Sequence, residues 1–161
     1  MWVNKLNYGT FTGKTEKTHV DEFKVQNTEG DTIFLSHFRG KYVVVDCWYT
    51  YCGICYKKLP QVQEMYNKYK RNTNITVFAL HSRITDRKGY NKENLKTGSD
   101  ILTTRMRLSI PCYSIDIDDP KLRELGVLGY PTVLVFDRES NLVFRGSVEN
   151  ATKYIDNISL N

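Results

Sequence analysis

A chain of 161 residues, 40% hydrophobic and 25% charged, has the size and composition of one globular domain. Basic residues outnumber acidic ones, 23 against 18, but they are scattered along the chain and form no stripe of the kind that binds nucleic acid. The sequence has no apolar run approaching the roughly 18 residues of a membrane span, no apolar secretory signal in its first twenty residues, and too few cysteines, four, for a disulfide-built scaffold.

Residues 1–20 are polar and carry no sustained apolar period, which predicts a tail or linker ahead of one domain spanning 21–161. Two short β-prone runs, 23–26 and 32–35, flank a connection that contains Gly30, so we expect a hairpin there. The run YVVVDCW at 42–48 is apolar except for one acid. This pattern is typical of a strand covered on both faces, and it predicts a central place in a sheet.

An amphipathic helix is expected next, because apolar residues recur three and four apart from 53 to about 70. A second buried strand at 75–80 completes a βαβ unit, in which the two strands are parallel and the crossover is right-handed. The segment 82–108 is polar, and we expect a helix in its second half, at 92–107. The other expected elements are a strand at 111–116, a helix at 121–125, a hairpin of strands at 132–136 and 142–145, and a terminal helix at 150–158.

The motif Cys52-Gly53-Ile54-Cys55 follows the buried strand and opens the expected helix. A thiolate at a helix N-terminus faces unpaired backbone N–H groups, which lower its pKa and favour the nucleophilic form. Cys52 is therefore the expected attacking sulfur, and Cys55 is placed to attack a mixed disulfide and release the product. The alternatives are a structural disulfide, or half of a zinc site for which the remaining two cysteines supply no second pair.

Asp46 is a further candidate, because it lies within the buried strand six residues before Cys52. An unpaired carboxylate is unfavourable in such a place, so burial is expected to raise its pKa and make it a base for deprotonating Cys55. The alternative is a structural residue that hydrogen-bonds a neighbouring backbone amide.

Tyrosines surround the motif at positions 49, 51 and 56. They either form a shallow apolar docking surface for protein substrates or pack locally. Farther along, Tyr130-Pro131 precedes the strand at 132–136, and the residues alone leave this peptide bond either cis or trans.

Several segments resemble the thioredoxin superfamily, and within it the TlpA/ResA type of thiol-disulfide oxidoreductase. They are FRGK at 38–41, VVVDCWYTYCGIC at 43–55, Pro60 in the expected helix and VLGYPT at 127–132. The resemblance covers about residues 21–158. It implies an α/β, thioredoxin-like fold, with a central mixed β-sheet flanked by helices and an N-terminal β-hairpin extension.

The same resemblance implies a site. Asp46 and Trp48 match the family's buried acid and active-site tryptophan, and Pro131 is implied to be cis and to pack beside the disulfide. The backbone of Tyr130 is implied to pair with an extended substrate segment by β-augmentation. Reducing thioredoxins often place a lysine near the buried acid, whereas the strand register expected here puts Ala79 there. The residues implied to contact substrate are Trp48, Tyr51, Gly53, Ile54, Tyr130 and Pro131.

The activity implied is disulfide exchange through Cys52 and Cys55, with no cofactor other than that redox-active pair and no metal. The implied partners are disulfide- or dithiol-containing proteins and an upstream thiol electron donor. The family comparison favours the periplasm or cell envelope, and the sequence leaves open whether a signal or anchor was removed from the chain. We expect a monomer.

Two other functions share this fold. A thiol peroxidase would need a Pro and a Thr arranged ahead of its reactive cysteine and an Arg nearby, an arrangement that Tyr49-Thr50-Tyr51 lacks. A copper-delivery module of the Sco type separates its cysteines by three residues, where this chain has two, and adds a histidine ligand such as His37 or His81.

Overall fold

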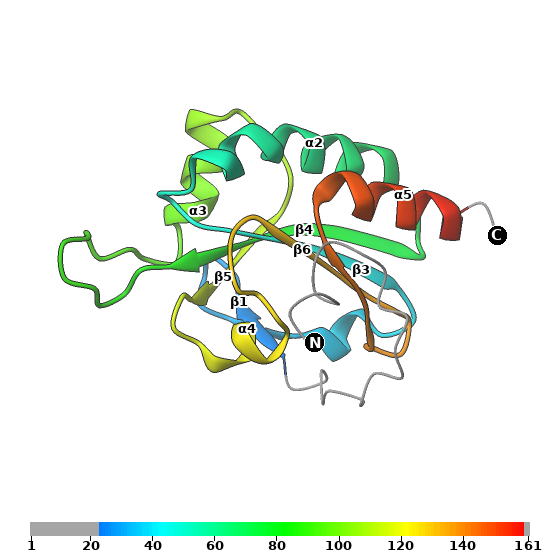
Figure 1. The fold of residues 1–161 in the computed structure, drawn as a ribbon, viewed down its shortest axis with the longest axis horizontal. Coiled ribbons are helices and arrows are strands. Elements are labelled where there is room, and N and C mark those ends of the chain that lie inside the picture. The colour runs from blue at the N-terminus through cyan, green and yellow to red at the C-terminus, as the bar shows by residue number, and fades with distance from the viewer. Residues whose placement is uncertain (1–22, 160–161) are drawn as a thin grey trace.

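A computed structural model describes residues 23–159. These residues form a seven-stranded mixed sheet in the order β2-β1-β5-β4-β3-β6-β7 (Figure 1). The tail predicted for residues 1–20 lies outside the described residues. The strands are β1 (Lys24–Gln26), β2 (Thr32–Phe34), β3 (Tyr42–Trp48), β4 (Ile75–Arg83), β5 (Cys112–Asp116), β6 (Thr132–Phe136) and β7 (Leu142–Gly146). The helical elements are η2 (Leu35–Phe38), α2 (Gly53–Tyr69), α3 (Thr97–Asp100), the π-helical turn η3 (Ile101–Arg105), α4 (Pro120–Glu124) and α5 (Val148–Ser159).

The centre of the sheet is the predicted βαβ unit. Strand β3 pairs in parallel with β4 and antiparallel with β6, and β4 pairs in parallel with β5. The predicted N-terminal hairpin is present as β1 and β2, and it joins the sheet where Gln26 pairs with Ser114 of β5. The second hairpin, β6 with β7, forms the opposite edge. The mixed, helix-flanked sheet predicted from the sequence is therefore confirmed.

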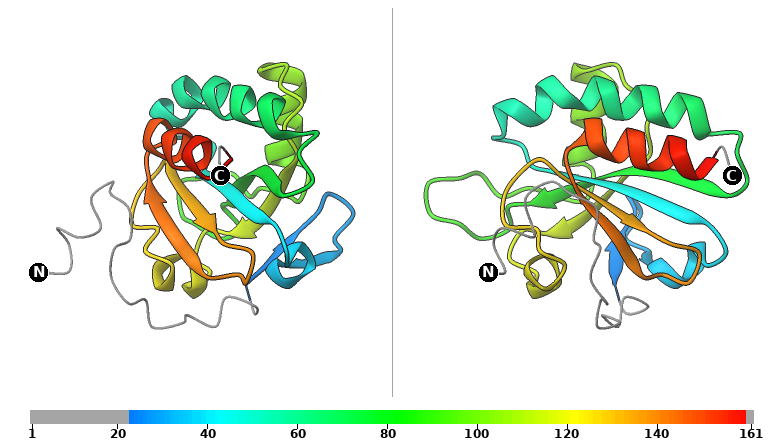
Figure 2. Two further views of the ribbon diagram at one scale, coloured as in Figure 1. Left: turned by 90° about the vertical axis from the view of Figure 1, so that its right-hand side faces the viewer. Right: turned by 45° about the vertical axis from the view of Figure 1, so that its right-hand side comes forward.

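Helices cover both faces of the sheet. Helices α2 and α5 lie side by side over one face, joined by the ion pairs Lys58–Glu149 and Lys68–Asp156, while α4 lies on the other face (Figures 1 and 2). Side chains of β3 alternate between two apolar clusters: Val44 and Trp48 face α2, whereas Val43, Val45 and Cys47 face α4. The strand is buried on both faces, as its continuous apolar pattern predicts.

Two elements differ from the prediction. Strand β4 extends beyond residue 80 to Arg83, because His81, Ser82 and Arg83 pair with β5 and the first two are completely buried despite their polarity. The helix predicted at 92–107 begins only at Thr97. The backbone before it is held in a turn, where Asn94 Oδ1 accepts the Lys96 N–H at 2.8 Å and Thr97 Oγ1 accepts the Asn94 N–H at 3.0 Å. Side-chain bonds of this kind compete with helix formation.

Gly98 in α3 gives a test of how tightly this segment packs on β4. A methyl group added at Gly98 would lie 2.5 Å from both Cβ and Cγ of His81, so Gly98→Ala must displace a buried ring. We expect Gly98→Ala to lower the free energy of unfolding by about 1–3 kcal/mol, measured by urea denaturation. Gly129→Ala is the control, because nothing lies within 4 Å of its added methyl group. Equal stability of the two variants would contradict the packing.

Candidate active site

The two cysteines of the motif form a disulfide at the start of α2. Cys52 is the N-cap residue, with extended backbone angles, and its Sγ accepts a hydrogen bond from the Cys55 N–H at 3.1 Å. Cys52 retains 7% of its accessible surface and Cys55 retains 1%. The first sulfur is therefore the more accessible one, and it lies at the positive end of the helix dipole.

The cis-proline loop emerges at the same edge of the sheet as the disulfide. Strands β3 and β6 are antiparallel and Cys47 pairs with Thr132, so the chain leaving β3 and the chain entering β6 meet there. The Tyr130–Pro131 peptide bond is cis. The ring of Tyr130 lies 5.0 Å from that of Tyr49, and its hydroxyl donates to Ser82 Oγ at 2.9 Å. The structure thus brings Tyr130 and the segment ahead of Cys52 together.

The side chains around the disulfide divide into exposed and packed ones. Tyr51 and Ile54 are 50% and 58% exposed, and Gly53 between the cysteines is also exposed. Trp48 is not at this surface. It is completely buried, with its ring 4.7 Å from His81 and 6.0 Å from Tyr56, and its contact with substrate stays a prediction.

Local packing also accounts for two of the three flanking tyrosines. Tyr49 and Tyr56 are half-buried: the former lies on Tyr130, and the hydroxyl of the latter donates to the Thr50 carbonyl at 2.7 Å. Tyr51 alone is exposed, and its ring lies 5.0 Å from that of Tyr90 in the loop after β4.

A cavity of about 710 Å³ lies beside the cis-proline loop. Two of the residues that line it, Arg87 and Asp118, form an ion pair at 2.6 Å. Aromatic and aliphatic side chains complete much of that lining, among them Tyr49, Tyr90, Leu128 and Tyr130. A pocket of this size and mixed character has room for side chains of a bound polypeptide.

Asp46 lies within β3 on the face covered by α2, between its sheet neighbours Ala79 and Val133. The register beside Ala79 is the one expected from the sequence. Asp46 is 2% exposed, and its Oδ1 has no hydrogen-bond partner among the described residues. Burial raises the pKa of this carboxyl from 3.8 to about 8. Both its protonated and its ionised forms are therefore accessible near neutral pH.

The remaining cysteines lie in poor surroundings for a thiolate. Burial, with a further contribution from Asp46, strongly raises the pKa of the Cys47 thiol, and burial raises that of Cys112 to about 12. Within residues 23–159, no cluster of three or more His, Cys, Asp or Glu side chains is arranged to hold a metal ion. His81, a candidate copper ligand, is completely buried, with Nε2 2.9 Å from Thr50 Oγ1.

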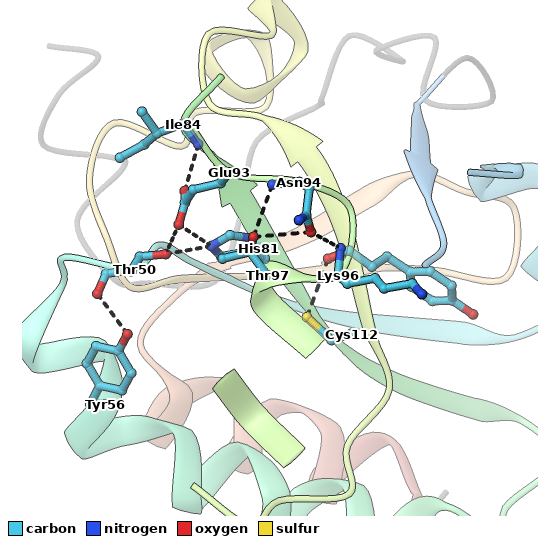
Figure 3. A network of polar contacts seen from close by, with 10 residues as sticks. Thr50, Tyr56, His81, Ile84, Glu93, Asn94, Lys96, Thr97 and Cys112 are labelled. Carbon is cyan, nitrogen blue, oxygen red and sulfur yellow. Dashed lines mark hydrogen bonds and ion pairs between the residues drawn. The ribbon is translucent and has the colours of Figure 1, made fainter. Parts of the chain in front are cut away.

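Figure 3 shows a polar network that the sequence analysis missed and that adjoins the motif along the chain through Thr50. It consists of Thr50, two residues before Cys52, together with His81 of β4 and Glu93 of the following loop. Glu93 is only 8% exposed. No spacing rule connects these three positions, since they meet only through the fold. The only sequence signal was a histidine at the end of an apolar strand.

Comparisons with known proteins identify the family of the chain. A sequence model described as the AhpC/TSA family matches residues 17–145. The thiol-disulfide oxidoreductase ResA of Bacillus thuringiensis subsp. konkukian is 30% identical over 142 residues, which cover 86% of this chain and 75% of that protein. ResA of Bacillus cereus is 28% identical over 140 residues, covering 84% and 74%.

Solved structures share the fold. The pneumococcal exposed lipoprotein thioredoxin of Streptococcus pneumoniae aligns with a TM-score of 0.62 at 24% identity, covering 84% of this chain and 98% of that one. The thioredoxin domain of a thiol-disulfide oxidoreductase from Bacteroides vulgatus aligns with a TM-score of 0.67 at 21% identity, covering 88% and 96%. At these identities the likeness establishes a thioredoxin-like fold.

A disulfide at the start of a helix, in this fold and with these relatives, defines a thiol-disulfide oxidoreductase. The chain belongs to the AhpC/TSA family, and its curated relatives are the oxidoreductases named ResA. The resemblance stated from the sequence is thereby confirmed.

The buried carboxyl of Asp46 predicts an unusual dependence of stability on pH. Because its pKa is about 8 in the folded protein and ordinary in the unfolded chain, the folded state holds this proton between pH 4 and 8 while the unfolded state releases it. The contribution of Asp46 to stability therefore falls as pH rises, by up to about 1.4 kcal/mol per pH unit.

We expect Asp46→Asn, which cannot titrate, to gain stability relative to the parent protein progressively from pH 5 to pH 8, measured by urea denaturation of the oxidised forms. Asp100→Asn is the control, because Asp100 is exposed. Parallel pH profiles for Asp46→Asn and the parent would show that this carboxyl ionises normally in the fold.

Proposed function

We propose that Cys52 is the attacking thiolate and Cys55 the resolving thiol in disulfide exchange with partner proteins. The observation that carries this assignment is the position of Cys52, which caps α2, accepts the Cys55 N–H and is the more accessible sulfur. The backbone N–H groups and the helix dipole stabilise a negative charge on its sulfur once the disulfide is reduced.

In the reducing direction, the Cys52 thiolate attacks one sulfur of a substrate disulfide. A mixed disulfide forms, and the other substrate sulfur leaves as a thiolate that takes a proton from solvent. Cys55 then loses its proton and attacks the Cys52 sulfur, which closes the Cys52–Cys55 disulfide and releases the second substrate thiolate. Two electrons pass to the substrate, and the reverse sequence oxidises a dithiol. A thiol electron donor upstream restores the reduced enzyme.

Asp46 is the proposed base for Cys55, acting directly or through a water molecule. Its position supports this role, because it lies on the face of β3 that α2 covers, the helix that carries Cys55. A pKa of about 8 suits a group that must accept a proton from a thiol near neutral pH and then return it to solvent.

The substrate segment is proposed to lie across Tyr51, Gly53 and Ile54, with the backbone of Tyr130 beside cis-Pro131 pairing with it as an added strand. The exposure of the first three residues and the shared sheet edge support this placement. Backbone pairing recognises an extended conformation rather than one sequence, so it would allow more than one protein substrate.

We place the protein as a monomer in the cell envelope, using no cofactor beyond its own disulfide. The supporting comparison for the location is the pneumococcal relative, which is an exposed lipoprotein. Within residues 23–159, no helix is both long and apolar enough to cross a membrane.

Serine variants test the roles of the two sulfurs. Cys55→Ser should stop after the first step and accumulate a mixed disulfide with insulin or another disulfide protein, visible by mass spectrometry as a covalent adduct on Cys52. Cys52→Ser should form no adduct and lose turnover. Cys112→Ser should react like the parent protein. Adducts on Cys55 in Cys52→Ser, with none in Cys55→Ser, would reverse the assignment.

Asp46→Asn tests the proposed base. It should slow the second step about 10²-fold near pH 7, the usual effect of removing a general base, while the first attack by Cys52 continues. The mixed disulfide should therefore accumulate transiently in acid-quenched samples, and raising the pH should restore its resolution by ionising Cys55 directly. Asp100→Asn serves again as the matched control. A resolution rate unchanged in Asp46→Asn would remove Asp46 from the mechanism.

A further inference from the structure

Glu93 is a buried acid that the exchange mechanism does not use. Its Oε2 accepts a hydrogen bond from the Thr50 hydroxyl, and its Oε1 accepts the Ile84 N–H at 2.8 Å (Figure 3). His81 Nε2 lies 2.9 Å from Thr50 Oγ1 and 3.7 Å from Glu93 Oε2. Thr50 lies two residues before Cys52, so the network adjoins the segment that carries the reacting sulfur.

The donors and acceptors can be arranged in only one direction if Glu93 is a carboxylate. A threonine hydroxyl has one proton, and it is given to Glu93, so Thr50 Oγ1 must accept its second bond from His81 Nε2–H. His81 therefore carries a proton on Nε2, and in a neutral ring Nδ1 is left with a bare lone pair. That atom is buried without a partner among the described residues. Burial also lowers the pKa of His81 to about 4, which is consistent with a neutral ring.

This chain of bonds fixes the backbone that leads into the disulfide. The Thr50 side chain is tied to β4 through His81 and to the following loop through Glu93, while the Thr50 carbonyl accepts the Tyr56 hydroxyl from α2 at 2.7 Å. The Cys52 N–H donates to the Tyr49 carbonyl at 3.2 Å. Three separate elements therefore converge on residue 50.

We propose that Glu93 is a positioning residue for disulfide exchange, which acts through the Thr50 hydroxyl and the His81 ring to hold the residues before Cys52 in place. This inference rests on the proposed role of Cys52 as the attacking sulfur. Attack on a disulfide requires the three sulfurs to be aligned, so freedom in the segment that carries Cys52 lowers the rate without removing any reacting group.

A role of Glu93 through its charge and a role through its hydrogen bonds predict different results in variants. If the carboxylate acted only through its charge, Glu93→Gln would change the reactivity of Cys52 and Thr50→Val would not. If it acts by positioning, both substitutions slow exchange. Thr50→Val removes the hydroxyl, and Glu93→Gln leaves one acceptor oxygen for two donors, the Thr50 hydroxyl and the Ile84 N–H, so the connection breaks at one of its ends. Thr50→Ser keeps the hydroxyl and should restore the parent rate, which makes the serine and valine variants a matched pair.

The test measures the second-order rate constant for reaction of each reduced protein with glutathione disulfide, by stopped-flow, at pH 7. We expect about a tenfold decrease in Glu93→Gln and in Thr50→Val, and a rate within about twofold of the parent in Thr50→Ser. Glu139→Gln, in the exposed turn between β6 and β7, should match the parent. Urea denaturation establishes that each variant is fully folded under the assay conditions, so that a lower rate cannot reflect unfolded protein.

Nitrogen NMR of the imidazole supplies a readout that stability alone would not change. The parent protein should show His81 protonated on Nε2 and bare on Nδ1 at pH 7. The opposite tautomer would overturn the proposed direction of the bonds. A parent-like rate in folded Thr50→Val, or a faster rate in Glu93→Gln with no change in Thr50→Val, would overturn the positioning role.

The control that separates this inference from the proposed function is Cys52→Ser. If Cys52→Ser is inactive while Glu93→Gln and Thr50→Val react like the parent, Cys52 remains the attacking sulfur and only the role of Glu93 is lost. If Cys52→Ser still exchanges disulfides at the parent rate, the proposed function itself is wrong.

Discussion

The hydrogen bond from the Cys55 N–H to the Cys52 sulfur is the contact on which the site depends. It places a reactive sulfur where the first backbone N–H groups of a helix have no partner within the helix. The helix keeps that position because Leu59, Val62 and Met65 are buried against the sheet. A thiolate on Cys52 therefore requires little rearrangement, since the dipoles that stabilise it are already oriented by packing elsewhere in α2.

Two buried acids near this sulfur have opposite surroundings. Asp46 lies among apolar neighbours, and its Oδ1 has no hydrogen-bond partner within residues 23–159, so burial raises its pKa into the range where a proton can be exchanged. Glu93 accepts hydrogen bonds on both oxygens, which suits a residue that holds its neighbours in one geometry. The two residues are both carboxylic acids, so their different surroundings account for the difference. Asp46 is suited to exchanging a proton, and Glu93 is suited to holding the backbone in place.

The local pattern of apolar residues was sufficient to predict the elements that surround the disulfide. It was not sufficient to predict the polar network of Thr50, His81 and Glu93. The apolar run of β3 and the period of α2 identify buried faces, so the βαβ unit and both cysteines could be placed from the sequence. Burial of Trp48 and the extension of β4 to Arg83 depend on strands distant in the chain. Glu93 had no signal at all, because its partner Thr50 lies 43 residues away and the loop path alone brings them together.

The loop after β4 contacts both the exposed Tyr51 ring and the Thr50 hydroxyl. Glu93 closes the loop at its base, since its N–H donates to the Ile84 carbonyl at 2.8 Å and its Oε1 accepts the Ile84 N–H at 2.8 Å. Within the closed loop, Tyr90 lies against Tyr51, the exposed residue that precedes Cys52. The same carboxylate therefore anchors both the aromatic surface beside the disulfide and the residue that leads into it. A loop held in this way keeps the exposed aromatic surface, which is proposed for docking, in a fixed relation to the sulfur, because a displacement of either is resisted by buried hydrogen bonds rather than by flexible surface contacts.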